Sequence, residues 1–196
     1  MKNIPIETIK SVKLIYKKLH KWNLARDTIT NYFEKNKHKN SKEVILIKVS
    51  IIDSLYRTNL FDNVGVANHI YSIKSLDEDL SNEKNSAVEK IANWKKNILS
   101  FATKYCHFHN KEVYPLYDQY VVSALRNLIG WKDKRTYQNF LNGINQFKSK
   151  YNLESISLED IDTFLWLYGQ KLKLKKGKKD INKEVYGLYT HGKLNF

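Results

Sequence analysis

The sequence is poor in the residues that build disulfide-rich, zinc-binding or membrane proteins. Cys106 is its one cysteine, so neither an intrachain disulfide nor a zinc site of several cysteines can form. The segment that follows Met1 to Pro5 is interrupted by Lys10 and Lys13, unlike the apolar core of a signal peptide. No run approaches the roughly 18 apolar residues of a membrane span. We therefore predict a cytoplasmic protein with no membrane partner.

Glycine and proline are also scarce. The chain of 196 residues has only seven glycines and two prolines, which is few of the turn-forming residues that a sheet protein needs. The apolar residues instead recur at the three- and four-residue steps of helices. Aromatic residues make up 13% of the chain, enough to build a packed core. The sequence therefore predicts an all-α fold, with one compact multi-helix domain over residues 1–196.

Arginine is rare although the chain is strongly basic. Only four of the 34 basic residues are arginines, and the formal net charge is +14. Such an excess commonly serves to neutralise the phosphates of nucleic acid. Lysine contacts phosphates as a point charge, whereas bidentate reading of base edges calls for arginine. We expect a nucleic-acid partner, with double-stranded DNA as the first choice. A lysine-rich composition without a binding role is the alternative.

Helical periodicity places most of the chain in helices. The expected helices cover Ile6–Leu19, Leu24–Phe33, Ser41–Tyr56, Val64–Ile73, Trp94–Tyr105, Val121–Ile129, Asp133–Phe147 and a last one that begins after Ser157, its expected N-cap. Ser41–Tyr56 is so apolar that it is expected to be the central buried helix, although a strand is an alternative there. The acidic segment Ser75–Asn85 is expected to be a loop. Gly130 is expected to end one helix, and the last helix to end at Gly169 or beyond.

The segment from Ser100 to Val121 carries the strongest signal for chemistry. A helix containing Lys104 is followed by a break over His107–Pro115 and then by Asp118 at the start of the next helix. Asp118 is open to two interpretations. It is either an N-cap, which accepts hydrogen bonds from the first amides of its helix, or a carboxylate with a catalytic role.

The segment Ser100 to Leu125 resembles the catalytic region of helix-hairpin-helix DNA glycosylases, in particular those of the 8-oxoguanine type. The shared pattern is a helix and loop leading to Pro-x-x-Asp, here Pro115 to Asp118, and then to Val121. This resemblance implies the glycosylase fold and assigns to Asp118 the carboxylate that stabilises cationic character at the sugar as the damaged base departs. It covers about 30 residues closely; elsewhere only the number and order of helices agree.

Two positions depart from the pattern of that family. Its bifunctional members carry a Schiff-base lysine about eighteen residues before the aspartate, where this chain has Ser100. Lys96 and Lys104 are expected one turn either side of Ser100, where either could replace that amine. A monofunctional glycosylase is therefore favoured over a lyase. The glycine hairpin that holds a DNA phosphate is also missing, so Lys95 and Lys96 are expected to bind phosphate by charge.

The densest run of positive charge is a basic segment, residues 171–180, which is expected to be exposed. It contains Lys173, Lys175 and Lys176, which are candidates for phosphate contacts or the solvated end of a helix. Trp166 and Tyr168 are expected in the core, with base stacking as the alternative. His107 and His109 lack the spacing and partners of a metal site. No metal and no cofactor are expected.

These observations predict a DNA-binding, glycosylase-like protein that acts on a modified or damaged base. The candidate catalytic residues are Asp118, Lys104 and Ser100. Two other functions remain open: a non-catalytic nucleic-acid-binding module on the same scaffold, and a protein-interaction domain whose lysines are compositional.

Overall fold

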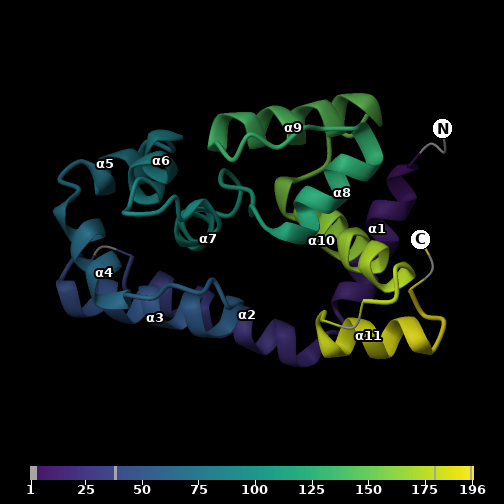
Figure 1. The fold of residues 1–196 in the computed structure, drawn as a ribbon, viewed down its shortest axis with the longest axis horizontal. Helices are drawn as coiled ribbons and strands as arrows, with labels where there is room; N and C mark the ends of the chain where they lie inside the picture. The colour runs from purple at the N-terminus through teal and green to yellow at the C-terminus, as the bar shows by residue number, and fades with distance from the viewer. Residues whose placement is uncertain (1–3, 38, 179, 195) are drawn as a thin grey trace. The chain divides into compact units, whose positions relative to one another are not determined.

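The chain is helical throughout the part that the structure describes. The computed structural model describes residues 4–37, 39–178, 180–194 and 196, and these contain eleven helices and no strand (Figure 1). The prediction of an all-α fold is thus confirmed. The helices are α1 (Ile6–Tyr16), α2 (His20–Lys35), α3 (Lys42–Tyr56), α4 (Asn63–Ser72), α5 (Leu76–Ser81), α6 (Ser86–Ala92), α7 (Leu99–His109), α8 (Gln119–Ile129), α9 (Tyr137–Lys150), α10 (Leu158–Lys175) and α11 (Lys183–Thr190).

The helices form two compact units. The terminal unit consists of Met1–Leu24 and Tyr117–Phe196, and the central unit of Ala25–Leu116. Helix α2 contributes its first residues to the terminal unit and the remainder to the central unit. That residues 1–196 form one domain stays a prediction.

Helix α3 supplies the core of the central unit. The Ser41 hydroxyl caps it by accepting a hydrogen bond from the Val44 amide, at 3.4 Å. Ile45, Val49 and Ile52 follow at helical spacing and are buried, and α3 packs against α4 and α7. The helix prediction is confirmed, and the strand alternative is wrong. Burial is one-sided, however, because Ile47 on the opposite face is 44% exposed.

Two segments of the central unit differ from the predictions. The expected loop at Ser75–Asn85 contains the short helix α5, whose Asp79 pairs with Lys90 of α6 at 2.5 Å. Helix α7 begins only at Leu99 because the preceding residues form a tight turn, closed by a bridge between Asn93 and Asn97. It then continues to His109, so the expected break at His107 is also wrong.

Close packing of α8 against α10 holds the terminal unit together. Ser157 caps α10, as predicted, by accepting a hydrogen bond from the Asp160 amide at 3.2 Å. Helix α10 passes through Gly169 and ends at Lys175, and Gly130 ends α8 with φ 68°. A Cβ atom at Gly169 would lie 2.7 Å from the Tyr120 Cα, so only glycine allows this approach of the two backbones.

We therefore expect Gly169→Ala to lower the free energy of unfolding by about 1 to 3 kcal/mol, because the methyl group forces α8 and α10 apart. Gly187→Ala in α11 is the control, since a Cβ atom there meets nothing within 4 Å. It should be neutral or should stabilise by up to about 1 kcal/mol, as alanine favours helix. Urea unfolding measures both, and equal effects would contradict the close-packing role of Gly169.

Candidate functional site

Helix α7 brings together two of the predicted catalytic residues. The Lys104 side chain is only 3% exposed, and its Nζ donates hydrogen bonds to the backbone oxygen and to Oγ of Ser100, both at 2.9 Å. Helical side chains lean toward the N-terminus, so a lysine lies above the residue four positions earlier. The ammonium of Lys104 thus lies directly against Ser100, the position at which the glycosylase resemblance would place an amine.

The chemistry open to this pair depends on the protonation of Lys104. As an ammonium it donates to both oxygens of Ser100, and it can stabilise negative charge that develops nearby. As a neutral amine it could attack a carbon centre or accept the hydroxyl proton of Ser100. Nζ of Lys104 also lies 5.6 Å from the centre of the Tyr56 ring, within the range of a cation–π contact.

Lys95 and Lys96 lie outside α7, in the turn from Asn93 to Asn97. The expectation that Lys96 shares a helix face with Ser100 is therefore wrong. Both lysines are exposed and lie over aromatic rings, Lys95 at 5.0 Å from the centre of Trp94 and Lys96 at 5.3 Å from that of Phe61. Phe61 is 92% exposed. We call these four residues the aromatic–basic surface.

Asp118 belongs to the terminal unit and caps α8. Its Oδ1 accepts hydrogen bonds from the amides of Tyr120, at 2.7 Å, and Val121, at 2.8 Å. The N-cap interpretation of Asp118 is confirmed, and its side chain is partly buried. The positive end of the helix dipole favours the ionised carboxylate at this place. Capping fixes the orientation of the carboxylate. The catalytic role of Asp118 stays a prediction.

The two histidines of α7 have packing and hydrogen-bonding roles. His107 Nδ1 lies 2.8 Å from the Tyr114 carbonyl and Nε2 lies 3.4 Å from Arg26. Because arginine only donates, this arrangement fits a neutral ring with its proton on Nδ1. The ring of His109 contacts those of Phe33 and Tyr105. Within the described residues no three His, Cys, Asp or Glu side chains are grouped to hold a metal ion.

Lys48 of α3 is a second buried lysine that the sequence analysis missed. It is 2% exposed, and its Nζ donates to the Asn36 carbonyl at 3.1 Å and lies 3.5 Å from His109 Nε2. Burial lowers the pKa of Lys48 to about 8, and Asp77 opposes this shift. Burial and the neighbouring charges of Lys48 and Lys37 lower the pKa of His109 to about 3. The sequence carries one signal for this burial, because Lys48 is the single lysine inside the apolar run of residues 44–52.

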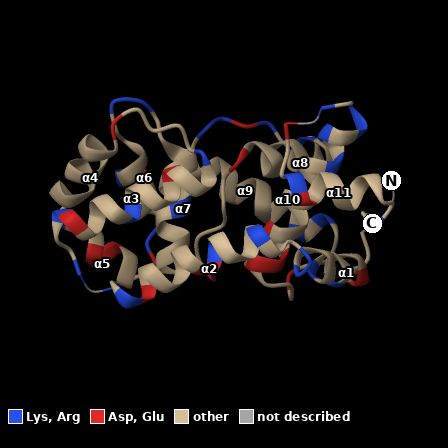
Figure 2. Ribbon diagram, turned by 90° about the horizontal axis from the view of Figure 1, so that it is seen from below, with Lys and Arg blue, Asp and Glu red and all other residues tan. Residues whose placement is uncertain are grey.

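The basic segment of residues 171–180 is exposed only in its second half. Lys173 is engaged by the terminal unit: its Nζ donates to Gln119 at 2.9 Å, pairs with Asp180 at 3.6 Å and lies over the Tyr120 ring. Lys175 and Lys176, in contrast, are exposed. Other lysines and arginines are spread over helices and connections of both units (Figure 2). Lys175 and Lys176 therefore remain the better candidates for phosphate contacts.

Trp166, expected in the core, is half-buried in the terminal unit. Its ring stacks on that of Trp22 at 4.9 Å between centroids and meets Tyr16 edge to face. The Tyr168 hydroxyl donates to Asn127 at 2.9 Å. Among the described helices, none has the length and apolar character needed to cross a membrane.

Comparison with known proteins places the chain in a family. Residues 8–113, more than half of the chain, match the family model described as HI_0787_N: N-terminal domain. An uncharacterized protein of Haemophilus influenzae is 32% identical over 143 residues, which make up 66% of this chain and 68% of that protein. No solved structure matches the chain. The matched family region includes Ser100 and Lys104 and ends before Asp118.

The buried charge of Lys48 predicts a pH-dependent stability. The pKa of Lys48 is about 8 in the folded chain and ordinarily 10.5, so between these values the unfolded chain binds more protons. The cost of burying the charge is fully present below about pH 8 and is lost as the pH rises toward 10.5. The free energy of unfolding should therefore rise with pH relative to that of Lys48→Met, which has no such charge.

Urea unfolding of both proteins between about pH 7 and 10 measures this difference. Lys35→Met, which removes an exposed lysine from the end of α2, controls for the loss of one surface charge. If the difference in the free energy of unfolding between wild type and Lys48→Met stays constant over this pH range, the assignment of a buried charge to Lys48 is refuted.

Proposed function

We propose that this chain, which belongs to the HI_0787_N family, is a DNA-binding, glycosylase-like protein that acts on a modified or damaged base. The reaction breaks the bond between the sugar C1′ and the base nitrogen, and the bonding electrons leave with the base. Water adds to C1′, its hydroxyl staying on the sugar while its proton is lost and the departing base is protonated. We place the protein in the cytoplasm, with double-stranded DNA as its partner.

The position of the Lys104 ammonium carries this proposal. Its contacts with Ser100 put a buried positive charge at the place where the glycosylase resemblance requires an amine, although residue 100 itself is serine. As a hydrogen-bond donor, Lys104 can stabilise negative charge on the departing base. For Asp118 the proposal rests on the resemblance alone, which assigns to this carboxylate the stabilisation of the cationic sugar. Because this chain has Ser100 where the bifunctional members of the family carry the Schiff-base lysine, water is the proposed nucleophile and a monofunctional enzyme is proposed.

The aromatic–basic surface supports DNA as the partner. Lys95 and Lys96 can neutralise phosphates, and the exposed ring of Phe61 beside Lys96 can stack on a base. The net charge of +14 adds long-range attraction. Binding phosphates and stacking on a base need no hydrogen bonds to base edges. The surface accordingly contains no arginine, the residue best suited to such bonds.

One observation favours a second function, a nucleic-acid-binding module without catalysis. Oδ1 of Asp118 accepts hydrogen bonds from two amides of α8, and this accounts for an aspartate at that position without any reaction. Both functions predict DNA binding, and they differ in base release.

Base release from damaged DNA separates these two functions. We expect the purified protein to release the base from at least one duplex containing 8-oxoguanine, uracil, an alkylated base or a hypermodified base. Asp118→Asn should lower the single-turnover rate by about 100-fold or more, because the charge is lost. Its stability should change little, since asparagine caps helices about as well as aspartate.

Asp118→Ala is the matched control, which should lose about 1 kcal/mol of stability together with the cap. Borohydride should trap no covalent adduct with a monofunctional enzyme. An adduct that disappears in Lys104→Met would instead identify a lyase. If no duplex loses a base, the catalytic proposal fails and the binding module remains.

Binding to undamaged duplex tests the aromatic–basic surface. Combined Lys95→Ala and Lys96→Ala substitutions should weaken binding and lower the slope of log affinity against log salt by about 2, between about 50 and 200 mM salt. Phe61→Ala should weaken binding without changing that slope, because it removes stacking only. Fluorescence anisotropy measures both, with Lys10→Ala in α1 as the control.

Salt-independent binding, or variants that behave like the Lys10→Ala control, would exclude this surface as a DNA contact. The first of these results would favour the protein-interaction alternative.

A further inference from the structure

Helix α9 of the terminal unit presents an exposed row of uncharged polar side chains. Gln138, Asn142 and Asn145 follow one another at steps of four and three residues, and Ser149 continues the row. All four are exposed, and they share one side of the helix because residues three and four apart are neighbours on its surface. The apolar side chains of α9 are buried on its other side. We call these four residues the amide row.

The chain around the amide row exposes no acidic side chain. From Gln119 to Leu153 the sequence has six basic residues and one acidic residue, Asp133. The Asp133 side chain is only 5% exposed, and it accepts hydrogen bonds from the Tyr117 hydroxyl at 2.7 Å and the Arg135 amide at 2.8 Å. Within this stretch, therefore, no exposed carboxylate opposes the approach of a polyanion.

A basic loop, residues 130–136, runs beside the amide row. The buried Trp131 anchors it, since a Cβ atom at Gly143 would lie 2.8 Å from the indole nitrogen, and this nitrogen donates to the Asn139 carbonyl at 3.2 Å. The Lys134 amide donates to the Asn139 side chain at 2.9 Å. Asn139 and Gly143 adjoin the amide row on the helix, so the loop lies along one edge of that row. Its three cations are exposed: Lys132, Lys134 and Arg135.

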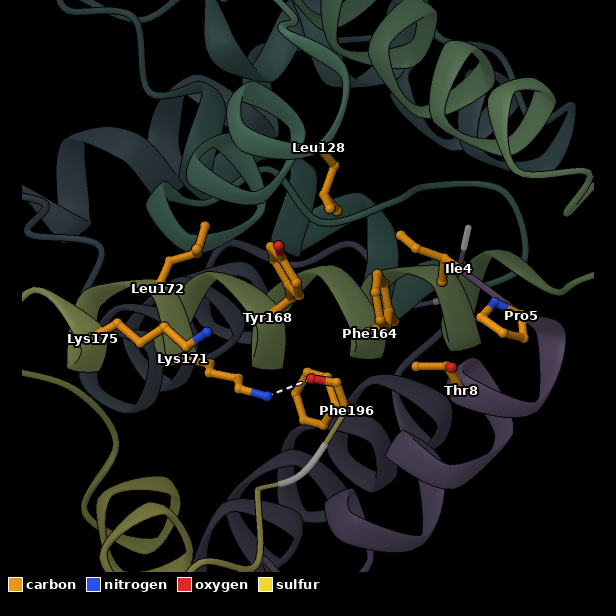
Figure 3. Close-up of a pocket in the computed structure, with 10 residues that line it drawn as sticks. All are labelled: Ile4, Pro5, Thr8, Leu128, Phe164, Tyr168, Lys171, Leu172, Lys175 and Phe196. Atoms are coloured by element: carbon orange, nitrogen blue, oxygen red, sulfur yellow. Dashed lines mark hydrogen bonds between the residues drawn. The ribbon is translucent and has the colours of Figure 1, made fainter. Parts of the chain in front are cut away.

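The cavity of the terminal unit is not part of this surface. It measures about 280 Å³, and its mostly apolar wall comes from the segment before α1, Leu128 of α8, one face of α10 with Lys171 and Lys175, and Phe196 (Figure 3). Its lining includes no residue of α9 or of the basic loop. The amide row is therefore a separate surface of the unit.

Exposed amides beside a row of cations suit the major groove of duplex DNA. That groove admits an α-helix, and Asn or Gln can form two hydrogen bonds with N6 and N7 of adenine. Guanine is read by Arg or Lys and cytosine by Asp or Glu, and the amide row contains none of these. Gln138 donates to Asn142 at 3.1 Å, a bond that orients both amides and uses one donor of the first and one lone pair of the second. The row therefore suits A·T base pairs.

We propose that α9 enters the major groove and that the amide row reads the edges of adenine, while the cations of the basic loop contact the flanking phosphates. The inference rests on the proposed function only in taking DNA as the partner, and it does not depend on base release. It gives the chain a preference for sequence, which phosphate contacts and stacking at the aromatic–basic surface do not supply.

Selection from a randomised duplex library tests this preference. The purified chain retains its ligands over several rounds, and the retained duplexes are sequenced. We expect a site with adjacent A·T pairs to be enriched and to bind about tenfold more tightly than a scrambled duplex of the same composition. Replacing its adenines by 7-deazaadenine removes N7 from the major groove but keeps base pairing, and it should abolish the preference. Enrichment of no sequence, or equal affinity for the 7-deazaadenine duplex, would overturn the proposal.

Two double variants separate base reading from phosphate contact. Gln138→Ala with Asn142→Ala should bind the selected duplex only as tightly as the scrambled one, with an unchanged salt slope. Both positions are exposed on a helix, where alanine is favourable, so the fold should be kept. Lys132→Ala with Lys134→Ala should weaken binding to both duplexes and lower the slope of log affinity against log salt by about 2. Asn68→Ala, at an exposed amide of α4, is the control.

These measurements distinguish failure of this inference from failure of the proposed function. If the sequence preference survives in the Gln138→Ala, Asn142→Ala variant, α9 is not the reader, whereas DNA binding and base release stand as proposed. If the wild-type chain binds no duplex, both the major-groove reading and DNA as the partner are wrong. A sequence preference without base release supports α9 as the reader and removes only the catalytic proposal.

Discussion

The burial of helix α7 is the constraint on which the candidate chemistry of the central unit depends. Residues 101–108 are buried, and these eight residues cover more than two turns, so every face of the helix is enclosed. A buried polar group without a partner costs about 1 to 3 kcal/mol. Lys104 therefore turns back to Ser100, and His107 holds the Tyr114 carbonyl. Because a buried polar group needs a partner, the amino group of Lys104 is held at a defined point beside Ser100.

The lysine excess divides into groups with different physical roles. Lys48 is buried and bonded within the central unit, so it adds nothing to a DNA-binding surface, and Lys104 is buried against Ser100. Lys173 is held by Gln119 and Asp180. Lys95 and Lys96 are exposed and lie beside aromatic rings, and they suit a polyanion best. The net charge of +14 therefore overstates the charge available to a partner, and placement matters more than number.

Sequence reasoning succeeded where the signal lies within one or two turns of helix. The caps Ser157 and Asp118 bond to amides two or three residues further along the chain, and Gly130 ends its helix by its own φ. It failed for α5, a six-residue helix too short to show apolar periodicity. Asp79 is instead held by Lys84 and Lys90, and this support comes from outside the helix.

The sequence alone determined the helical class, most of the helices, the cap at Ser157 and the sign of the charge, because these follow from periodicity and from bonds between near neighbours. Only the tertiary structure decided which lysines are buried, that Phe61 is exposed beside Lys96, and that Lys171 and Lys175 line an apolar cavity. The physical reason is that burial depends on distant segments that pack against a residue. Lys48 and Lys104 look like any other lysine until α3 and α7 are enclosed.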